Sequence, residues 1–144
     1  MTSLTAFDPH APTTPEDRLA VEICLHKILD AARAGDADLL ASHHLYGPKF
    51  TKFDDFEPLE RQEAGAARAG EDAIAQVDNF RYSVDDLRID VFGPTAIATF
   101  VLDYGFDADG EHITARARST LMFVADGPDW KIAHEHLSPF KSNP

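Results

Sequence analysis

The sequence predicts an α+β domain in which helices come first and a mainly antiparallel sheet follows. Several segments before Phe80 have apolar residues at helical spacing, whereas after Phe80 apolar and polar residues alternate with a period of two. Short turns rich in Asp, Gly and Pro divide the second half of the chain into four segments, as in a meander of strands. Helices followed by a meander indicate a curved sheet covered on one face by helices.

The first predicted helix begins at Pro15, with Thr14 as its N-cap, and ends at Gly35. Its apolar residues recur at helical spacing and form one broad stripe: Leu19, Val21, Ile23, Leu25, Ile28, Leu29 and Ala31.

Three shorter elements are expected before the meander. Asp36 is placed to cap a helix over residues 37–44, in which His43 and His44 suit the negative end of the helix dipole. Residues 50–54 alternate and predict a short strand. Residues 57–70 are either a loop or a frayed helix, and residues 71–79 are predicted as the third helix.

Four strands are predicted over residues 81–92, 94–107, 111–125 and 130–138. A turn at residues 107–110 places Phe106 opposite Glu111, so that one face of this hairpin is apolar and concave. The opposite, convex face then carries Thr99, Val101, Asp103, Thr114, Arg116 and Arg118.

The last strand places two histidines, His134 and His136, on the same face as Ile132, with Glu135 on the other face. A bulge at the turn of residues 127–128 would exchange these faces and bring both imidazoles into the cavity. Without a third ligand on their face, the two histidines do not predict a metal site. We expect neither a metal nor a cofactor.

Composition limits the partners of the chain. Its 144 residues include 25 Asp and Glu against 13 Lys and Arg, a net charge of −12, which disfavours binding to nucleic acids or anionic membranes. The single cysteine excludes an intrachain disulfide. Residues 1–14 have neither the basic nor the apolar region of a signal peptide and predict a flexible arm, so we expect a cytoplasmic protein.

The closing stretch Trp-Lys-Ile-Ala-His-Glu-His-Leu-Ser, residues 130–138, resembles the last hairpin of the NTF2-like superfamily. The resemblance is to its SnoaL-like branch, which includes bacterial relatives of the CaMKII association domain. It implies a single cone-shaped domain over residues 15–140, with three N-terminal helices packed on a strongly curved sheet. It also implies one pocket and a homodimer formed through the convex sheet face.

The resemblance further implies candidate site residues. Ketosteroid isomerases of this superfamily have their general base at the end of the first short strand, where this chain has Asp54. Neighbouring aromatic side chains would desolvate that carboxyl and raise its pKa. Tyr104 and His136 are the other catalytic candidates. The residues expected to bind a ligand are Tyr46, Phe50, Phe53, Phe80, Phe100, Tyr104, Ser119 and Leu121.

Two functions remain open at this point. The sequence and the resemblance favour a homodimer that binds a small apolar or aromatic molecule, and the alternative is a cofactor-free isomerase, dehydratase or cyclase with Asp54 as its base. Tyr104 or a histidine within hydrogen-bonding reach of Asp54 would favour catalysis, whereas Asp54 alone among apolar side chains would favour binding. A hub module like the CaMKII association domain is a third hypothesis.

Overall fold

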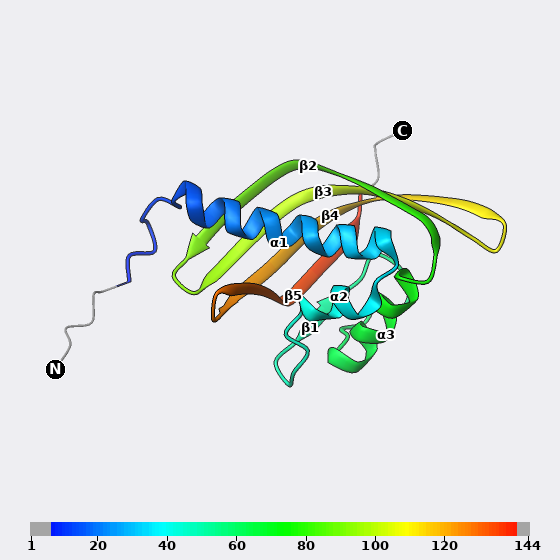
Figure 1. Cartoon of the computed structure of the whole chain (residues 1–144), viewed down its shortest axis with the longest axis horizontal. Helices are drawn as coiled ribbons and strands as arrows, with labels where there is room; N and C mark the ends of the chain where they lie inside the picture. The colour runs from blue at the N-terminus through cyan, green and yellow to red at the C-terminus, as the bar shows by residue number, and fades with distance from the viewer. Residues whose placement is uncertain (1–6, 141–144) are drawn as a thin grey trace.

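The computed structural model describes residues 7–140 and shows three helices packed on one face of a five-stranded sheet (Figure 1). The elements in chain order are α1 (Pro15–Ala34), α2 (Ala37–Ser42), β1 (Thr51–Phe53), α3 (Ala64–Ile74), β2 (Asp78–Phe92), β3 (Thr95–Ala108), β4 (Glu111–Asp126) and β5 (Asp129–Pro139). The strand order is β1-β5-β4-β3-β2, with β1 parallel to β5 and the other pairs antiparallel. The predicted α+β architecture is confirmed.

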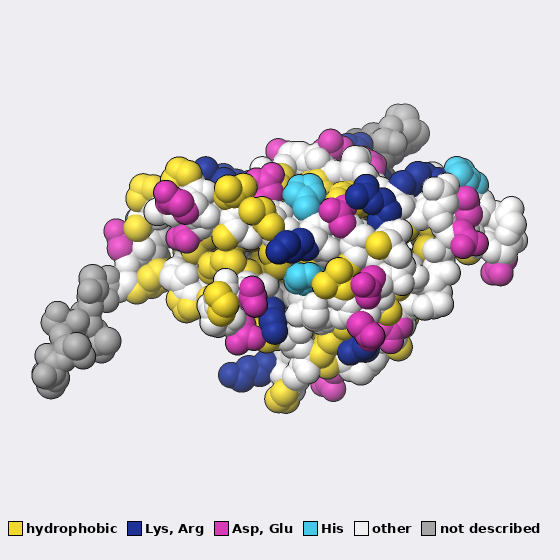
Figure 2. All heavy atoms as spheres, viewed as in Figure 1, with side chains coloured by type: hydrophobic (Ala, Val, Ile, Leu, Met, Phe, Trp, Pro, Cys, Tyr) yellow, Lys and Arg dark blue, Asp and Glu magenta, His cyan; other side chains and the backbone are white. Residues whose placement is uncertain are grey.

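The helix α1 begins and ends as the sequence predicts. The Thr14 side chain accepts a hydrogen bond from the Asp17 N–H at 3.2 Å, and Gly35 ends the helix at a φ of +71°. The predicted apolar stripe is too broad, because Leu19 and Ile23 are 56% and 45% exposed. Each lies two residues, or about 200° around the helix axis, from the fully buried Val21. Figure 2 shows hydrophobic side chains gathered where α1 begins.

The third helix differs from its prediction. Residues 64–74 form α3, and the strand β2 begins at Asp78, so a helix over residues 71–79 is wrong. The sequence did not decide between a loop and a helix for residues 57–70, and the structure places the Ala-rich residues 64–70 in α3. Asn79 has a φ of +54°, a left-handed conformation that a helix could not contain.

The hairpin of β3 and β4 has the predicted faces but a different register. Ala108 pairs with Glu111 across a two-residue turn, and Phe106 therefore pairs with Ile113 instead of Glu111. Asp109 and Gly110 both have positive φ, as a tight hairpin turn requires. Because the register moves by two residues, every side chain stays on its predicted face.

The strand β5 contains a bulge that determines the site. Ile132 pairs with Phe123 and His134 pairs with Met122, so Ala133 is an extra residue without a partner. Ile132 and Glu135 are therefore both buried toward the helices. His134 and His136 lie on the opposite face, which corrects the prediction that they share a face with Ile132.

The described part of the N-terminal arm contacts the sheet. The Thr13 hydroxyl accepts a hydrogen bond from the Val91 N–H at 3.0 Å, and a side chain added at Gly93 would meet the Phe7 ring. Residues 1–6 of the predicted arm lie outside the described residues. Within residues 7–140, no helix is both long and apolar enough to cross a membrane.

Candidate functional site

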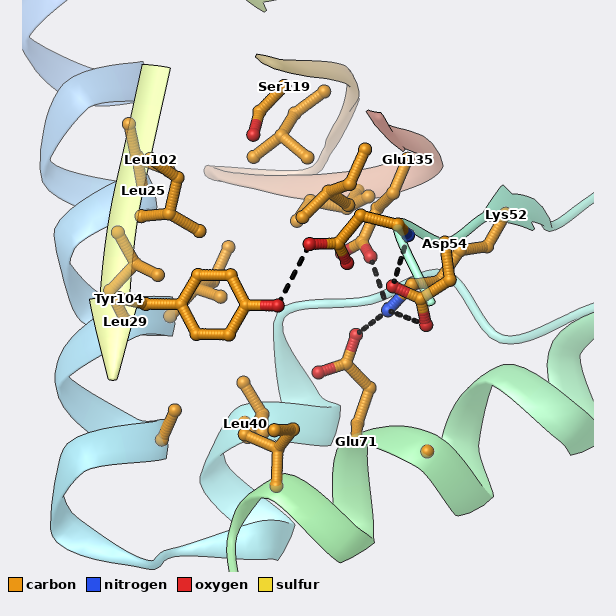
Figure 3. A pocket seen from close by; sticks show the side chains of 18 of the residues that line it. Leu25, Leu29, Leu40, Lys52, Asp54, Glu71, Leu102, Tyr104, Ser119 and Glu135 are labelled. Carbon is orange, nitrogen blue, oxygen red and sulfur yellow. Dashed lines mark hydrogen bonds and ion pairs between the residues drawn. The ribbon is translucent and has the colours of Figure 1, made fainter. Parts of the chain in front are cut away.

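A cavity of about 110 Å³ lies between the helices and the concave face of the sheet (Figure 3). Its walls are mostly Leu, Ile and Phe side chains from α1 and the strands. Its polar lining residues are Lys52, Asp54, Asp55, Glu71, Tyr104, Ser119 and Glu135. An apolar cavity with a few converging polar groups is the usual form of a small-molecule site.

Six of the residues proposed from the sequence line this cavity: Asp54, Phe80, Phe100, Tyr104, Ser119 and Leu121. The other four are placed elsewhere. Phe50 is buried in the core, and the Tyr46 ring stacks on His44 with centroids 5.0 Å apart. Phe53 and His136 contact one another across the convex side, with ring centroids 5.3 Å apart. The placement of these four outside the cavity lining corrects the sequence prediction.

Phe53 points away from the cavity because its neighbour Lys52 points in. In a strand, successive side chains lie on opposite faces. Lys52 is only 7% exposed and pairs with Glu135 in the parallel ladder of β1 and β5, while Phe53 pairs with His136. A buried lysine flanked by Thr and Phe reverses the usual apolar-in pattern, so alternation alone does not show which face of this strand points into the cavity.

Tyr104 and two consecutive aspartates form a hydrogen-bonded chain at one end of the cavity. The Tyr104 hydroxyl donates to Asp55 Oδ2 at 2.9 Å, and the Asp55 N–H donates to Asp54 Oδ1 at 3.2 Å. Figure 3 shows the Tyr104 side chain reaching from β3 across the cavity to this bond. Burial raises the pKa of Tyr104, so the phenol stays neutral and remains a donor.

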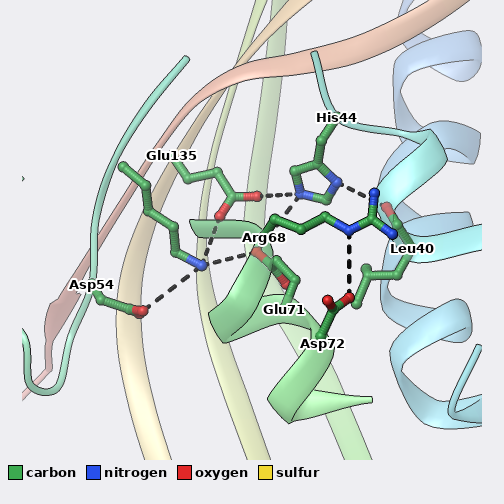
Figure 4. Close-up of polar contacts among 8 residues, drawn as sticks. Leu40, His44, Asp54, Arg68, Glu71, Asp72 and Glu135 are labelled. Atoms are coloured by element: carbon green, nitrogen blue, oxygen red, sulfur yellow. Dashed lines mark hydrogen bonds and ion pairs between the residues drawn. The ribbon is translucent and has the colours of Figure 1, made fainter. Parts of the chain in front are cut away.

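The Lys52 ammonium connects Asp54 to two glutamates, the buried Glu135 and the partly buried Glu71. Its Nζ lies 2.9 Å from Glu71 Oε1, 3.1 Å from Glu135 Oε2 and 3.8 Å from Asp54 Oδ2 (Figure 4). Burial alone would lower the pKa of Lys52, but the three carboxylates hold it well above its ordinary value. Lys52 is therefore a permanent cation beside the cavity.

His44 supplies a second buried cation. Its Nδ1 lies 2.8 Å from the Leu40 carbonyl oxygen, and its Nε2 lies 2.8 Å from Glu135 Oε1. A carbonyl and a carboxylate only accept, so both ring nitrogens must donate and the ring is an imidazolium. Burial opposes the charge, yet the bond to Glu135 leaves the pKa of His44 raised. The sequence placed His44 at a helix end and missed this partner.

The three carboxyls around Lys52 titrate differently. Burial would raise the pKa of Glu135, but Lys52 and His44 together hold it far below its ordinary value. Desolvation raises the pKa of Glu71, whose side chain is 12% exposed, and the neighbouring Glu135 anion raises it further. Burial raises the pKa of Asp54 too, although Lys52 opposes this. Asp54 therefore holds its proton more strongly than an exposed aspartate does.

The spacing of His44, Glu71 and Glu135 would also suit a metal ion. One ligand atom from each lies within 4.8 Å of the others. The Lys52 ammonium contacts both of these glutamates, so the chain supplies its own positive charge at this position. A divalent ion here would have to displace Lys52 or be repelled by it.

Comparisons with known proteins agree with this fold. Residues 21–142 match the family of SnoaL-like domains, so the chain belongs to that family. No curated protein matches the sequence.

Three solved structures illustrate the likeness. A putative dehydratase of the NTF2-like family from Streptomyces avermitilis is 20% identical with a TM-score of 0.77, over 90% of this chain and 100% of that one. A putative calcium/calmodulin-dependent kinase II association domain from Exiguobacterium sibiricum is 14% identical with a TM-score of 0.74, over 92% and 100%. A CaMKII hub from S. rosetta is 24% identical with a TM-score of 0.67, over 90% and 100%. At these identities the likeness is one of fold.

Proposed function

We propose that this protein is a cofactor-free acid/base enzyme that isomerises or dehydrates a small, largely apolar molecule. The observation that carries the proposal is the chain from Tyr104 through Asp55 to Asp54, which ends in an apolar cavity. The mark of catalysis expected from the sequence is Tyr104 or a histidine within hydrogen-bonding reach of Asp54. The Tyr104 hydroxyl donates to Asp55 instead, and the Asp55 N–H donates to Asp54, so Asp54 does not stand alone among apolar side chains.

The cavity walls suit an apolar substrate. Phe80 and Tyr104 stack with their centroids 6.3 Å apart, and Phe100, Leu102 and Leu121 extend the apolar surface. Such walls exclude water, which strengthens each electrostatic interaction between the substrate and the polar end.

In this proposal Asp54 moves the proton. A raised pKa brings a carboxyl closer to the range in which it can both accept and return a proton near neutral pH. Asp55, held by the Tyr104 hydroxyl, orients the substrate beside it. Isomerisation needs a proton removed at one carbon and returned at another. Dehydration needs a proton removed from carbon and one given to the departing hydroxyl. The putative dehydratase from Streptomyces avermitilis has the same fold and is consistent with the second reaction.

Deuterium uptake by enolisable ketones tests this function without knowledge of the natural substrate. Cyclohexanone and 2-indanone are incubated in D₂O with the wild type, Asp54→Asn, or the control Asp78→Asn, an exposed aspartate at the start of β2. We expect the wild type and the control to accelerate exchange, and Asp54→Asn to lose about 100-fold of that acceleration. Equal exchange in all three proteins, or none above buffer, would contradict an acid/base role for Asp54.

A protein that binds these ketones but does not exchange them would be a binding protein, the other function that the sequence left open. Binding of the ketone in the cavity is measured on the same samples by NMR, from the chemical-shift changes of the backbone amides of the lining residues. This separates failure to bind from failure to react.

We also propose that the chain forms a homodimer through the convex sheet face. Ile97 is 38% exposed on that face, and a groove on the sheet is lined by Val101, Arg118, His136 and Phe140 among others. Exposed apolar side chains on a sheet face are typical of an interface. The hub and association domains of the same fold are consistent with self-association. The cytoplasm remains the proposed location, where the buried free thiol of Cys24 would stay reduced.

A further inference from the structure

Five buried side-chain polar atoms within residues 7–140 have no hydrogen-bond partner: His43 Nε2, Tyr46 Oη, Asp55 Oδ1, Gln62 Nε2 and Ser119 Oγ. Buried polar groups are nearly always paired, and each unpaired one costs free energy. Only Asp55 and Ser119 in this set belong to residues that line the cavity. These two atoms are therefore the ones that a ligand in the cavity could satisfy.

Asp55 offers one free acceptor to the cavity. Its Oδ2 already accepts from the Tyr104 hydroxyl, while Oδ1 is buried and unpaired. A carboxylate oxygen can only accept, so the group that satisfies it must be a donor such as a hydroxyl.

Ser119 offers a second polar atom from a different strand. It lies on β4, pairs with Phe100 of β3 and is 4% exposed. Leu121 and Phe100, which also line the cavity, give it apolar surroundings. A hydroxyl can donate or accept, so Ser119 could bind either a carbonyl or a hydroxyl. Figure 3 shows the Ser119 and Tyr104 side chains on different walls of the cavity.

We infer that the substrate is a mostly apolar molecule with oxygen groups at two positions: a hydroxyl that donates to Asp55 and a hydroxyl or carbonyl that binds Ser119. The inference rests on the proposed function and narrows its substrate to a class. In this arrangement Ser119 is a specificity residue, which selects molecules that carry the second oxygen.

Isosteric pairs of phenols test the inference, because each pair differs only by a methyl group replaced with a hydroxyl. The pairs are 4-methylphenol with hydroquinone, 4-ethylphenol with 4-hydroxybenzyl alcohol, and 4-propylphenol with 4-(2-hydroxyethyl)phenol. The three two-oxygen phenols differ in the number of carbons between the ring and the second hydroxyl, so they cover different separations of the two oxygens. Dissociation constants are measured by NMR titration for the wild type, Ser119→Ala and the matched control Thr120→Ala. Thr120 is the next residue of β4 and is exposed on the other face.

For at least one pair, we expect Ser119→Ala to reduce the affinity of the two-oxygen member relative to its alkyl partner by about 3- to 10-fold. Thr120→Ala should leave that ratio unchanged. If all three pairs give the same ratio in the wild type and in Ser119→Ala, Ser119 does not contact the ligand and the inference is overturned. If no phenol binds at all, the small-molecule site itself fails, and the inference fails with it.

Discussion

His44 Nε2 donates to Glu135 Oε1 at 2.8 Å, in a part of the molecule where the His44 side chain is 0% and the Glu135 side chain 6% exposed. The two residues are 91 positions apart in the chain, one just beyond α2 and the other on β5. The other oxygen of Glu135 lies 3.1 Å from Lys52 Nζ, so this one carboxylate contacts both buried cations beside the cavity. Loss of that carboxylate would leave the buried His44 with only the more distant Glu71, at 3.7 Å.

We therefore predict that Glu135→Leu lowers the free energy of unfolding by about 3–5 kcal/mol, because breaking a buried ion pair leaves an uncompensated charge. The matched control is Glu111→Leu, an exposed glutamate at the start of β4, which should change it by about 0.5 kcal/mol or less. Urea denaturation measures both values. Equal stability of the two variants would mean that Glu135 is solvated and that β5 has no bulge at Ala133.

The pair also predicts a pH dependence of stability. The pKa of His44 is raised in the folded protein. Its contribution to the free energy of unfolding is therefore complete below the pKa of the unfolded state, about 6.5, and is lost as the pH rises through the pKa of the folded state. The pKa of Glu135 is lowered in the folded protein. Its contribution to the free energy of unfolding is therefore present above the pKa of the unfolded state, about 4.3, and is lost only as the pH falls through the pKa of the folded state. The His44–Glu135 pair should therefore stabilise the fold most at pH values between these two unfolded-state pKa values.

The measurement compares the wild type with His44→Gln by urea denaturation at several pH values from about 5.5 to 9. The difference in unfolding free energy should be largest at the acidic end of this range and should shrink as the pH rises. A difference that grows with pH would show that His44 is buried in its neutral form.

The proposed dimer predicts a change in mass on a single substitution. Sedimentation of the wild type should give about twice the chain mass of 15.9 kDa. Ile97→Asp places a charge on the convex face and should yield the monomer, because an unpaired charge in an interface is strongly unfavourable. Leu19→Asp, at an equally apolar and more exposed position on α1, is the control and should stay dimeric. A monomeric wild type would contradict the interface.

Much of the fold could be predicted from local sequence patterns. Thr14, Pro15 and Gly35 mark the ends of α1 by their own chemistry, and the strand alternation after Phe80 persists over the whole meander. The tight turn at Asp109 and Gly110 also follows from residue type, although the sequence alone suggested a longer turn.

The cluster of His44, Lys52, Glu71 and Glu135 could not be predicted from the sequence. It depends on a bulge in β5, where one residue has no partner in the strand ladder. The bulge at Ala133 has no Gly or Pro to mark it, yet it reverses the faces of Glu135 and His136. Lys52 meets carboxylates from α3 and β5 that lie far from it in the sequence. Such long-range pairs leave no periodic signal in a single sequence. The carboxyl of Asp54, by contrast, was proposed from a resemblance and does line the cavity.

The proposed role of Asp54 depends most directly on its protonation, which NMR titration of its side-chain carboxyl carbon measures in the wild type. Because burial raises the pKa of Asp54 despite Lys52, we predict a value above the ordinary 3.9 or so, and a further increase in Lys52→Met. A value at or below about 3.9 in the wild type would mean that Asp54 is solvated or fully paired. That result would contradict its assignment as the group that moves a proton in the cavity.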